Sequence, residues 1–406
     1  MKTNILFSIL STGTNYVLPL IIIPYCIAGY GLDGYGVISL ALALTSIIAL
    51  ITQLNLENIF ASLPIDKCWS KVIEILVIKL TFFVLASVVI YIFLQFFIKE
   101  NVEVFLIGVW PLAFCVLNVN YFFIAQQNFK IIFLLNVLSK LFFTTIVFIF
   151  IYYRVPLSFV VMGMNGWYIT SSLIGFIVLR RQVLGNQCAE YLNVFFAKNT
   201  FLTFKKILPG FSSSLASLFL TMLVQPFMAI VTSNNYNTIA IYSICDKIIR
   251  AATGFLDSIN NVLYSKITGL SNSNEKRKIV SYVLFIYFFI EIIGGIILLN
   301  IYPYISDYIP KLKQYPQIEG LLLLIVPIIV IITIGNVISS LVLFTSGLFK
   351  QVTYAIIISS ITFMLFIFIP YLDKGAEYFL FALLCSEGIS TFLKGWLAWK
   401  RTTYFR

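Results

Sequence analysis

The sequence contains no histidine and few charged residues. Its 406 residues include 16 acidic ones, and charged residues make up 11% of the chain against 60% hydrophobic residues. The absence of histidine removes the commonest general base and the commonest metal ligand. The six cysteines are scattered, and no pair has the spacing of a metal or redox site. These absences argue against hydrolytic and metal chemistry and predict a protein with no metal site and no cofactor.

Apolar residues are present in excess of what a soluble core can bury, since soluble chains are about 45–50% apolar and about 25% charged. A bilayer span needs about 20 apolar residues, and about 34 residues per span with its loop would divide the chain into twelve. The N-terminal apolar stretch is too long for a signal-peptide core, so we expect a retained first span. The twelve predicted spans are 5–28, 36–57, 73–98, 104–126, 131–151, 157–179, 207–232, 238–263, 279–301, 320–343, 353–371 and 376–397. The sequence therefore predicts an all-α polytopic membrane protein.

The basic residues are divided unevenly between the two sides of these spans. With a cytoplasmic N-terminus, 18 of the 27 basic residues face the cytoplasm, Lys394 among them, 5 face the opposite side, and 4 lie within spans. This bias follows the positive-inside rule and predicts cytoplasmic termini. It also explains most of the net charge of +11 as membrane topology, so nucleic acid is not an expected partner.

The longest polar break, residues 180–206, divides the chain into two halves of six spans each. We expect an N-terminal six-helix lobe at 1–195 and a C-terminal six-helix lobe at 196–406. An even number of spans in each half implies a parallel repeat, which leaves a central cleft.

The segment DKIIRAATGFLD, residues 246–257, places four charged residues within the eighth predicted span. At 100° per residue, Asp246, Arg250 and Asp257 lie on one narrow face, and Lys247 lies beside it. Each charge costs about 2.5–3.5 kcal/mol to insert, so these residues should face partners or water. Either the stripe lines a hydrated cleft, where Arg250 and Lys247 meet an anionic substrate, or an Asp246–Arg250 ion pair joins helices. The two interpretations are compatible.

Further charges lie within other spans. Lys140 is near mid-depth in the fifth span and is a candidate to line the cleft. Glu291 in the ninth span is either a structural partner or a proton or cation site, and Glu387 in the twelfth is equally ambiguous. Lys79 lies nearer a span end, and we expect its ammonium to extend to the cytoplasmic interface.

Three segments resemble, in order and spacing, those of Wzx-type polysaccharide flippases. They are PLIIIPYCIAGYGLDGYGVISLALA at 19–43, YFFIAQQNFKIIFLLNVLSKLFF at 121–143 and IAIYSICDKIIRAATGFLDSINNVLYSKI at 239–267. The sequence departs from the family pattern where Gly31-Leu32 reverses an LG pair, Tyr121 replaces Trp, Gln127 replaces Gly and Ser265 replaces Pro.

This resemblance implies the fold of the multidrug/oligosaccharidyl-lipid/polysaccharide (MOP) exporters, with a V-shaped cleft between two lobes. It implies a transporter rather than an enzyme, located in the bacterial inner membrane. Its cargo would be an undecaprenyl-pyrophosphate-linked oligosaccharide, moved to the outer leaflet for O-antigen, lipopolysaccharide or capsule synthesis. Membrane lipids would surround it, and glycan polymerase and chain-length proteins are candidate partners. The resemblance implies that Lys247 and Arg250 contact the pyrophosphate, and Lys140 is the next candidate.

Three rival functions remain open, and one of them, a lipid scramblase without coupling, is not distinguished by sequence from the flippase. The first is a cation-coupled multidrug exporter of the same superfamily, although the first span has no acidic residue to attract a cationic drug. The second is a membrane glycosyltransferase or glycan polymerase, against which the missing histidine and the short outer loops argue.

Overall fold

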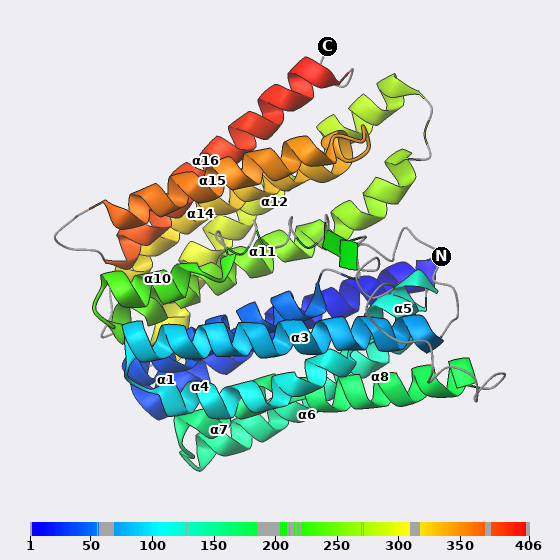
Figure 1. Cartoon of the computed structure of the whole chain (residues 1–406). Helices are drawn as coiled ribbons and strands as arrows, with labels where there is room; N and C mark the ends of the chain where they lie inside the picture. Colours follow the sequence, from blue (N-terminus) through cyan, green and yellow to red (C-terminus); the bar gives the residue numbers. More distant parts are fainter. Residues whose placement is uncertain are drawn as a thin grey trace. The chain divides into compact units, whose positions relative to one another are not determined.

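The computed structural model describes residues 2–54, 56, 69–126, 128–184, 221–268, 270, 272–308, 317–369 and 375–402, with isolated positions between 204 and 218. All regular secondary structure in these residues is helical, which confirms the predicted all-α class (Figure 1). Every predicted span overlaps a described helix. The predicted lobe boundary between residues 195 and 196 lies outside the described residues, and so does most of the polar break.

The first two predicted spans form one long element, α1 (Lys2–Gln53), which bends at Gly31. Its 52 residues would reach about 78 Å as a straight helix, more than twice the thickness of a bilayer core. Gly31 has φ 80° and ψ 178°, a conformation that residues with a Cβ rarely adopt. At Gly36, a Cβ would stand 2.1 Å from the carbonyl oxygen of Tyr236. Both glycines of this motif are therefore required by the backbone, one for a bend and one for a close approach.

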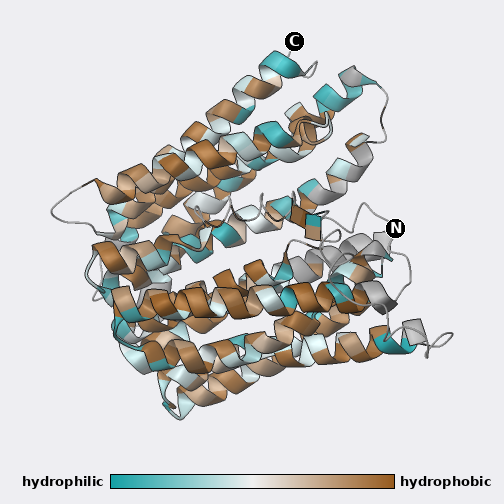
Figure 2. Cartoon of the chain, in the orientation of Figure 1, coloured by the Kyte–Doolittle hydropathy of each residue, from teal (hydrophilic) through white to brown (hydrophobic). Residues whose placement is uncertain are grey.

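Within the described residues, eight helices are long and apolar enough to cross a membrane, which confirms a multi-pass membrane protein. They cover 13–53, 72–98, 129–152, 157–181, 274–304, 319–343, 349–368 and 376–401. Helix α11 (Tyr236–Thr268), with 33 residues, is also long enough to cross a membrane. It is not among the eight, and it carries the charged residues of segment 246–257. Figure 2 shows this difference: α3 is largely hydrophobic, whereas α11 has pale and hydrophilic turns along its length.

The chain separates into two compact units, one of residues 1–11 with 37–226 and the other of residues 12–36 with 227–406. Residues 12–36 of α1 belong to the second unit. In the first unit, the end of α1 from residue 37 is followed by α3 (Trp69–Phe93), a π-helical turn (Leu94–Ile98), α4 (Val102–Val109), a 3-10 helix (Trp110–Leu117), α5 (Asn120–Ala125), α6 (Phe129–Tyr152), α7 (Leu157–Asn165) and α8 (Trp167–Leu184). Helix α7 packs on α4 and α6, and α8 packs on α6 and on the 3-10 helix.

The fourth span of the first unit is interrupted before α5. The 3-10 helix ends at Leu117, and Asn118 is extended, with ψ 121°. The carbonyl of Asn118 accepts a hydrogen bond from the Lys79 ammonium at 2.7 Å, and Lys79 is only 1% exposed. The expected extension of Lys79 to the interface is therefore wrong, because its ammonium satisfies a carbonyl that the helix break leaves outside a regular helix.

The second unit is built around α14 (Gln317–Val337), which continues as a π-helix (Ile338–Leu343). The other long helices are α11, α12 (Ser273–Tyr308), α15 (Phe349–Phe368) and α16 (Ala376–Arg401). Helix α14 packs against α11, α12 and α16, while α15 packs on α16. The short α10 (Val224–Val231) lies where the sequence passes from the first unit to the second. This arrangement brings polar residues of α11, α14 and α16 together inside the second unit.

A candidate anion-binding site on α11

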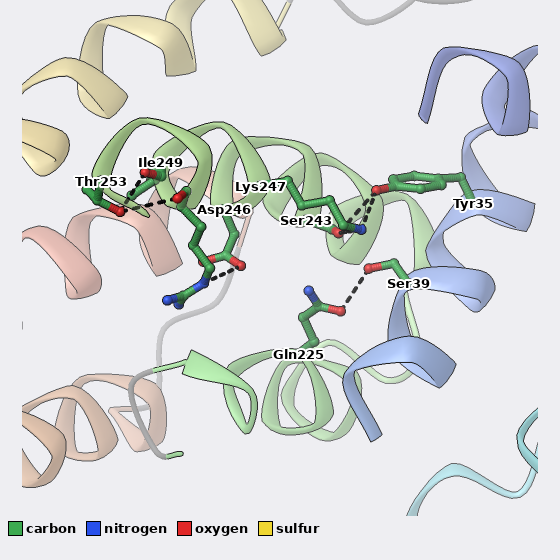
Figure 3. A network of polar contacts seen from close by, with 9 residues as sticks. Tyr35, Ser39, Gln225, Ser243, Asp246, Lys247, Ile249 and Thr253 are labelled. Carbon is green, nitrogen blue, oxygen red and sulfur yellow. Dashed lines mark hydrogen bonds and ion pairs between the residues drawn. The ribbon is translucent and has the colours of Figure 1, made fainter. Parts of the chain in front are cut away.

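Arg250 and Asp246 lie one turn apart on α11 and form the ion pair considered from the sequence. The Nε of Arg250 donates to Oδ2 of Asp246 at 3.0 Å (Figure 3). The Asp246 side chain is 9% exposed, whereas that of Arg250 is 37% exposed. The pair therefore joins a buried carboxylate to a partly exposed arginine side chain. One turn further, Thr253 donates its hydroxyl to the carbonyl of Ile249 at 2.9 Å and so needs no other partner.

Lys247 is held by hydroxyl groups rather than by a carboxylate. Its Nζ donates to the Tyr35 hydroxyl at 2.9 Å and to Ser243 Oγ at 3.3 Å, as Figure 3 shows. Its Nζ also lies 5.2 Å from the centroid of the Tyr35 ring. No ion pair joins Lys247 to another residue in the part of the chain that the structure describes. The positive charge of Lys247 is therefore not neutralised by a direct partner.

Tyr35 and Ser243 were not identified by sequence reasoning. Ser243 lies one turn before Lys247 on the same helix, and Tyr35 belongs to the first of the three family-like segments. A tyrosine on α1 can be connected with a lysine more than 200 residues later only when the fold is known. Figure 3 also draws a hydrogen bond of the first unit, from Ser39 Oγ to Gln225 Oε1 at 2.8 Å.

Asp257 belongs to a different group of polar contacts from Arg250. It accepts hydrogen bonds from the Asn260 amide at 3.3 Å and from the Asn336 amide of α14 at 2.9 Å. The amide of Asn336 crosses from one helix to another, so Asp257 joins α11 to α14. The narrow face predicted from helix geometry therefore separates into an accessible cationic part and a part buried against α14.

The two remaining predicted site residues lie on other helices. Lys140 is on α6 of the first unit, with its Nζ 4.3 Å from the ring centroid of Trp167. Glu291 is on α12 of the second unit and is 7% exposed. Neither of its carboxylate oxygens receives a hydrogen bond of good geometry from the described residues. A carboxyl group buried in this way is costly while charged, and Glu291 also interacts with the Thr333 hydroxyl of α14, so a structural partner and a proton or cation site both stay open.

Two of the cations on α11 have the chemistry that suits an anion. Their donors differ in kind, since Arg250 presents a planar fork that matches phosphate oxygens and Lys247 presents a compact point charge. Over the residues that the structure describes, no group of three or more acidic or cysteine side chains is placed to hold a metal ion.

The structure is similar to those of several solved transporters. It matches the lipid II flippase MurJ in an inward closed conformation, with TM-score 0.65 and 16% identity over 97% of this chain and 87% of that chain. It matches the eukaryotic MATE transporter AtDTX14 with TM-score 0.60 and 14% identity, over 99% and 94% of the two chains. A multidrug resistance MATE family transporter of the MOP superfamily, in its inward-facing conformation, matches with TM-score 0.59 and 16% identity, over 96% and 94%. These similarities confirm the predicted MOP-like fold.

The sequence itself also matches a known family. No curated protein sequence matches the chain closely. A family model described as polysaccharide biosynthesis protein, however, matches residues 1–268, which contain all three segments that resemble the flippases. Because this match covers more than half of the 406 residues, the chain belongs to the polysaccharide biosynthesis protein family.

Proposed function

We propose that this protein is a flippase that moves undecaprenyl-pyrophosphate-linked oligosaccharide units from the cytoplasmic to the outer leaflet. The product would serve a surface polysaccharide such as O-antigen or capsule. The family and the similarity to a lipid II flippase support transport of a lipid-linked glycan. In this proposal the protein lies in the bacterial inner membrane with both termini in the cytoplasm, and it carries out no covalent chemistry.

The partly exposed side chain of Arg250, paired with the buried Asp246, is the observation that carries the proposal. A pyrophosphate group can replace Asp246 as the partner of Arg250, because phosphate oxygens match the guanidinium donors and bring more negative charge. Lys247, three residues before Arg250 on the same helix, adds a second cation, and its hydrogen bonds to the described residues go to hydroxyl groups. Lys140 of the first unit is a third candidate contact. The lipid tail would remain in the bilayer while α11 holds the charged head group.

Two driving forces are available for this transport. A head group with about two negative charges gains about 4.6 kcal/mol on moving outward across 100 mV, inside negative. Alternatively, proton or cation exchange at Glu291 couples transport to an ion gradient. An ionophore that collapses only the potential separates the two: a slower rate supports the electrical drive, and an unchanged rate supports coupling at Glu291.

A cation-coupled multidrug exporter is the alternative that the MATE-like fold keeps open. It would need an accessible anionic site for a cationic drug. On α11 the accessible charge is the guanidinium and the buried charge is Asp246, which favours an anionic cargo. Detectable sugar transfer by the purified protein would instead support the alternative function of a glycan polymerase or glycosyltransferase.

The deciding experiment measures the leaflet of the lipid-linked oligosaccharide in the native host. The gene is deleted and then restored with the wild type, with Arg250→Ala or with Arg181→Ala, at equal expression. Arg181 is an exposed arginine in the last turn of α8, so Arg181→Ala is the matched control. An impermeant glycosidase or label reports the outward-facing fraction of the oligosaccharide.

We expect the deletion strain and the Arg250→Ala strain to retain the oligosaccharide on the inner leaflet and to lose surface glycan. Wild type and Arg181→Ala should restore both. The proposed function would be excluded if the deletion strain, with no second flippase present, had the same outward-facing fraction of oligosaccharide as the wild type. Efflux of cationic drugs would then be measured in the same strains.

A further inference from the structure

Lys394 lies inside the second unit rather than at the cytoplasmic side where the sequence placed it. It is 5% exposed on α16. The predicted span ended at residue 397, but α16 continues to Arg401, so Lys394 stands two turns from the helix end and faces inward. A lysine is almost never buried without a partner of opposite charge, and this position therefore requires an explanation.

The Lys394 ammonium lies beside Gly335 of α14, where a Cβ would clash with Thr391 and would only touch the ammonium. A Cβ on Gly335 would lie 3.6 Å from Lys394 Nζ and 2.5 Å from Thr391 Oγ1. The next residue, Asn336, donates to Asp257. The ammonium therefore points at the crossing of α11, α14 and α16, where Asp257 is held.

Two carboxylates compensate this ammonium electrostatically. Asp257 of α11 and Glu387 of α16 both interact with the charge of Lys394. No hydrogen bond or ion pair shorter than 4.0 Å joins Lys394 to another described residue. Glu387 also interacts with the charge of Arg250. The ammonium is thus a buried cation that interacts with two carboxylates through space rather than in a direct ion pair.

We propose that Lys394 is a tethered counter-cation for Asp257 and Glu387 and takes the place that a dissociable monovalent cation would otherwise occupy. Two partly buried carboxylates without a cation would repel each other and would bear an uncompensated cost of desolvation. A free sodium ion could neutralise them, but the ammonium carries the same charge and is already confined to the site by its own chain. A second cation in the same pocket would be repelled.

This inference goes beyond the proposed function, because it concerns ion occupancy of the cluster and its test needs no transport substrate. The full-length purified protein is reconstituted in nanodiscs, and its thermal unfolding midpoint is measured in sodium, lithium or choline chloride at equal ionic strength. The variants are Lys394→Met, Asp257→Asn and the double variant Lys394→Met/Asp257→Asn. Lys400→Met is the matched control, since Lys400 is an exposed lysine on the same helix.

For the wild type and for Lys400→Met, we expect midpoints that agree across the three salts. Lys394→Met should unfold a few degrees lower in choline and should recover part of that loss, saturably, in sodium or lithium. The thermal midpoint of the double variant should be the same in the three salts, because this variant lacks one positive and one negative charge.

Two results would overturn the proposal. One is a saturable sodium-specific stabilisation of the wild type that Asp257→Asn abolishes, since a dissociable ion would then occupy the cluster. The other is a Lys394→Met midpoint equal to that of the wild type in choline. If Lys394→Met fails to fold, a folded double variant still supports a charge-balancing role. Failure of the double variant while Asp257→Asn alone folds would argue against it.

Discussion

Lys79 of the first unit and Arg250 of the second are both basic residues inside apolar spans, but their surroundings differ. The Lys79 ammonium is 1% exposed and donates to a backbone carbonyl. The Arg250 side chain is 37% exposed and pairs with a carboxylate. The carbonyl cannot leave its place in the backbone, whereas an anionic ligand can replace a carboxylate. A basic residue in a span therefore does not define a binding site until its partner is known, and this difference leads us to propose a structural role for Lys79 and a binding role for Arg250.

The largest expected effect is the loss of transport in Arg250→Ala. A hydrogen bond to a charged group contributes about 1.5–3 kcal/mol, so the rate of flipping per folded molecule should fall by about 10- to 100-fold. The leaflet assay on reconstituted protein measures this rate, and the thermal midpoint should change little. Arg250→Lys, which keeps the charge but not the planar fork, should be intermediate. If Arg250→Ala transports at the wild-type rate, Arg250 has no binding role and does not differ from Lys79 in this respect.

Lys79→Met should give the opposite result, a loss of stability without a loss of function. The carbonyl of Asn118 would be left unsatisfied in the interior, at a cost of about 1–3 kcal/mol, which relief of the buried charge offsets in part. The thermal midpoint should therefore fall, while flipping per folded molecule stays within about twofold of the wild type. Lys130→Met, an exposed lysine at the start of α6, is the control for loss of one positive charge. Reduced flipping by a fully stable Lys79→Met would place Lys79 with the binding residues.

The sequence predicted the helices well because lipid imposes a simple rule on span length and apolarity. It also placed Asp246, Lys247, Arg250 and Asp257 on one helix, since that inference needs only helical periodicity. It could not divide them into separate groups, because Tyr35 and Asn336 come from distant parts of the chain.

The positions of Lys79 and Lys394 were predicted wrongly for a related reason. Distance from a span end suggests access to the interface, but a helix break at Asn118 attracts the first lysine. An inward-facing turn of α16, beside Gly335, accommodates the second. Neither feature follows from hydropathy, since both depend on which helix packs opposite the lysine.

A smaller effect is expected from Asp246→Asn, which keeps the shape of the ion pair but removes its negative charge. Partly exposed ion pairs contribute about 0.2–1 kcal/mol, so Arg250 should bind undecaprenyl pyrophosphate about two- to fivefold more tightly. Equilibrium binding to protein in nanodiscs measures the change. Glu377→Gln, at the exposed first turn of α16, serves as the control. Weaker binding would mean that Asp246 positions the guanidinium rather than competing for it.

The smallest expected effect is that of Tyr35→Phe. It tests whether Lys247 behaves like Lys79, for which we propose a structural role, or like Arg250, for which we propose a binding role. The change removes the hydroxyl that accepts from Lys247 at 2.9 Å and leaves Ser243 as the remaining hydroxyl partner. The Tyr35 hydroxyl is a neutral partner of Lys247, as the carbonyl of Asn118 is of Lys79. A structural role of Lys247 would therefore lead to a lower thermal midpoint in Tyr35→Phe. Because the charge of Lys247 is uncompensated, we instead expect flipping to fall by about two- to threefold with a midpoint within about 2 °C of the wild type. Tyr25→Phe, an exposed tyrosine earlier in α1, is the matched control. A clear drop in the midpoint with unchanged flipping would assign Lys247 to structure and leave Arg250 as the cation on α11 that binds the anionic head group.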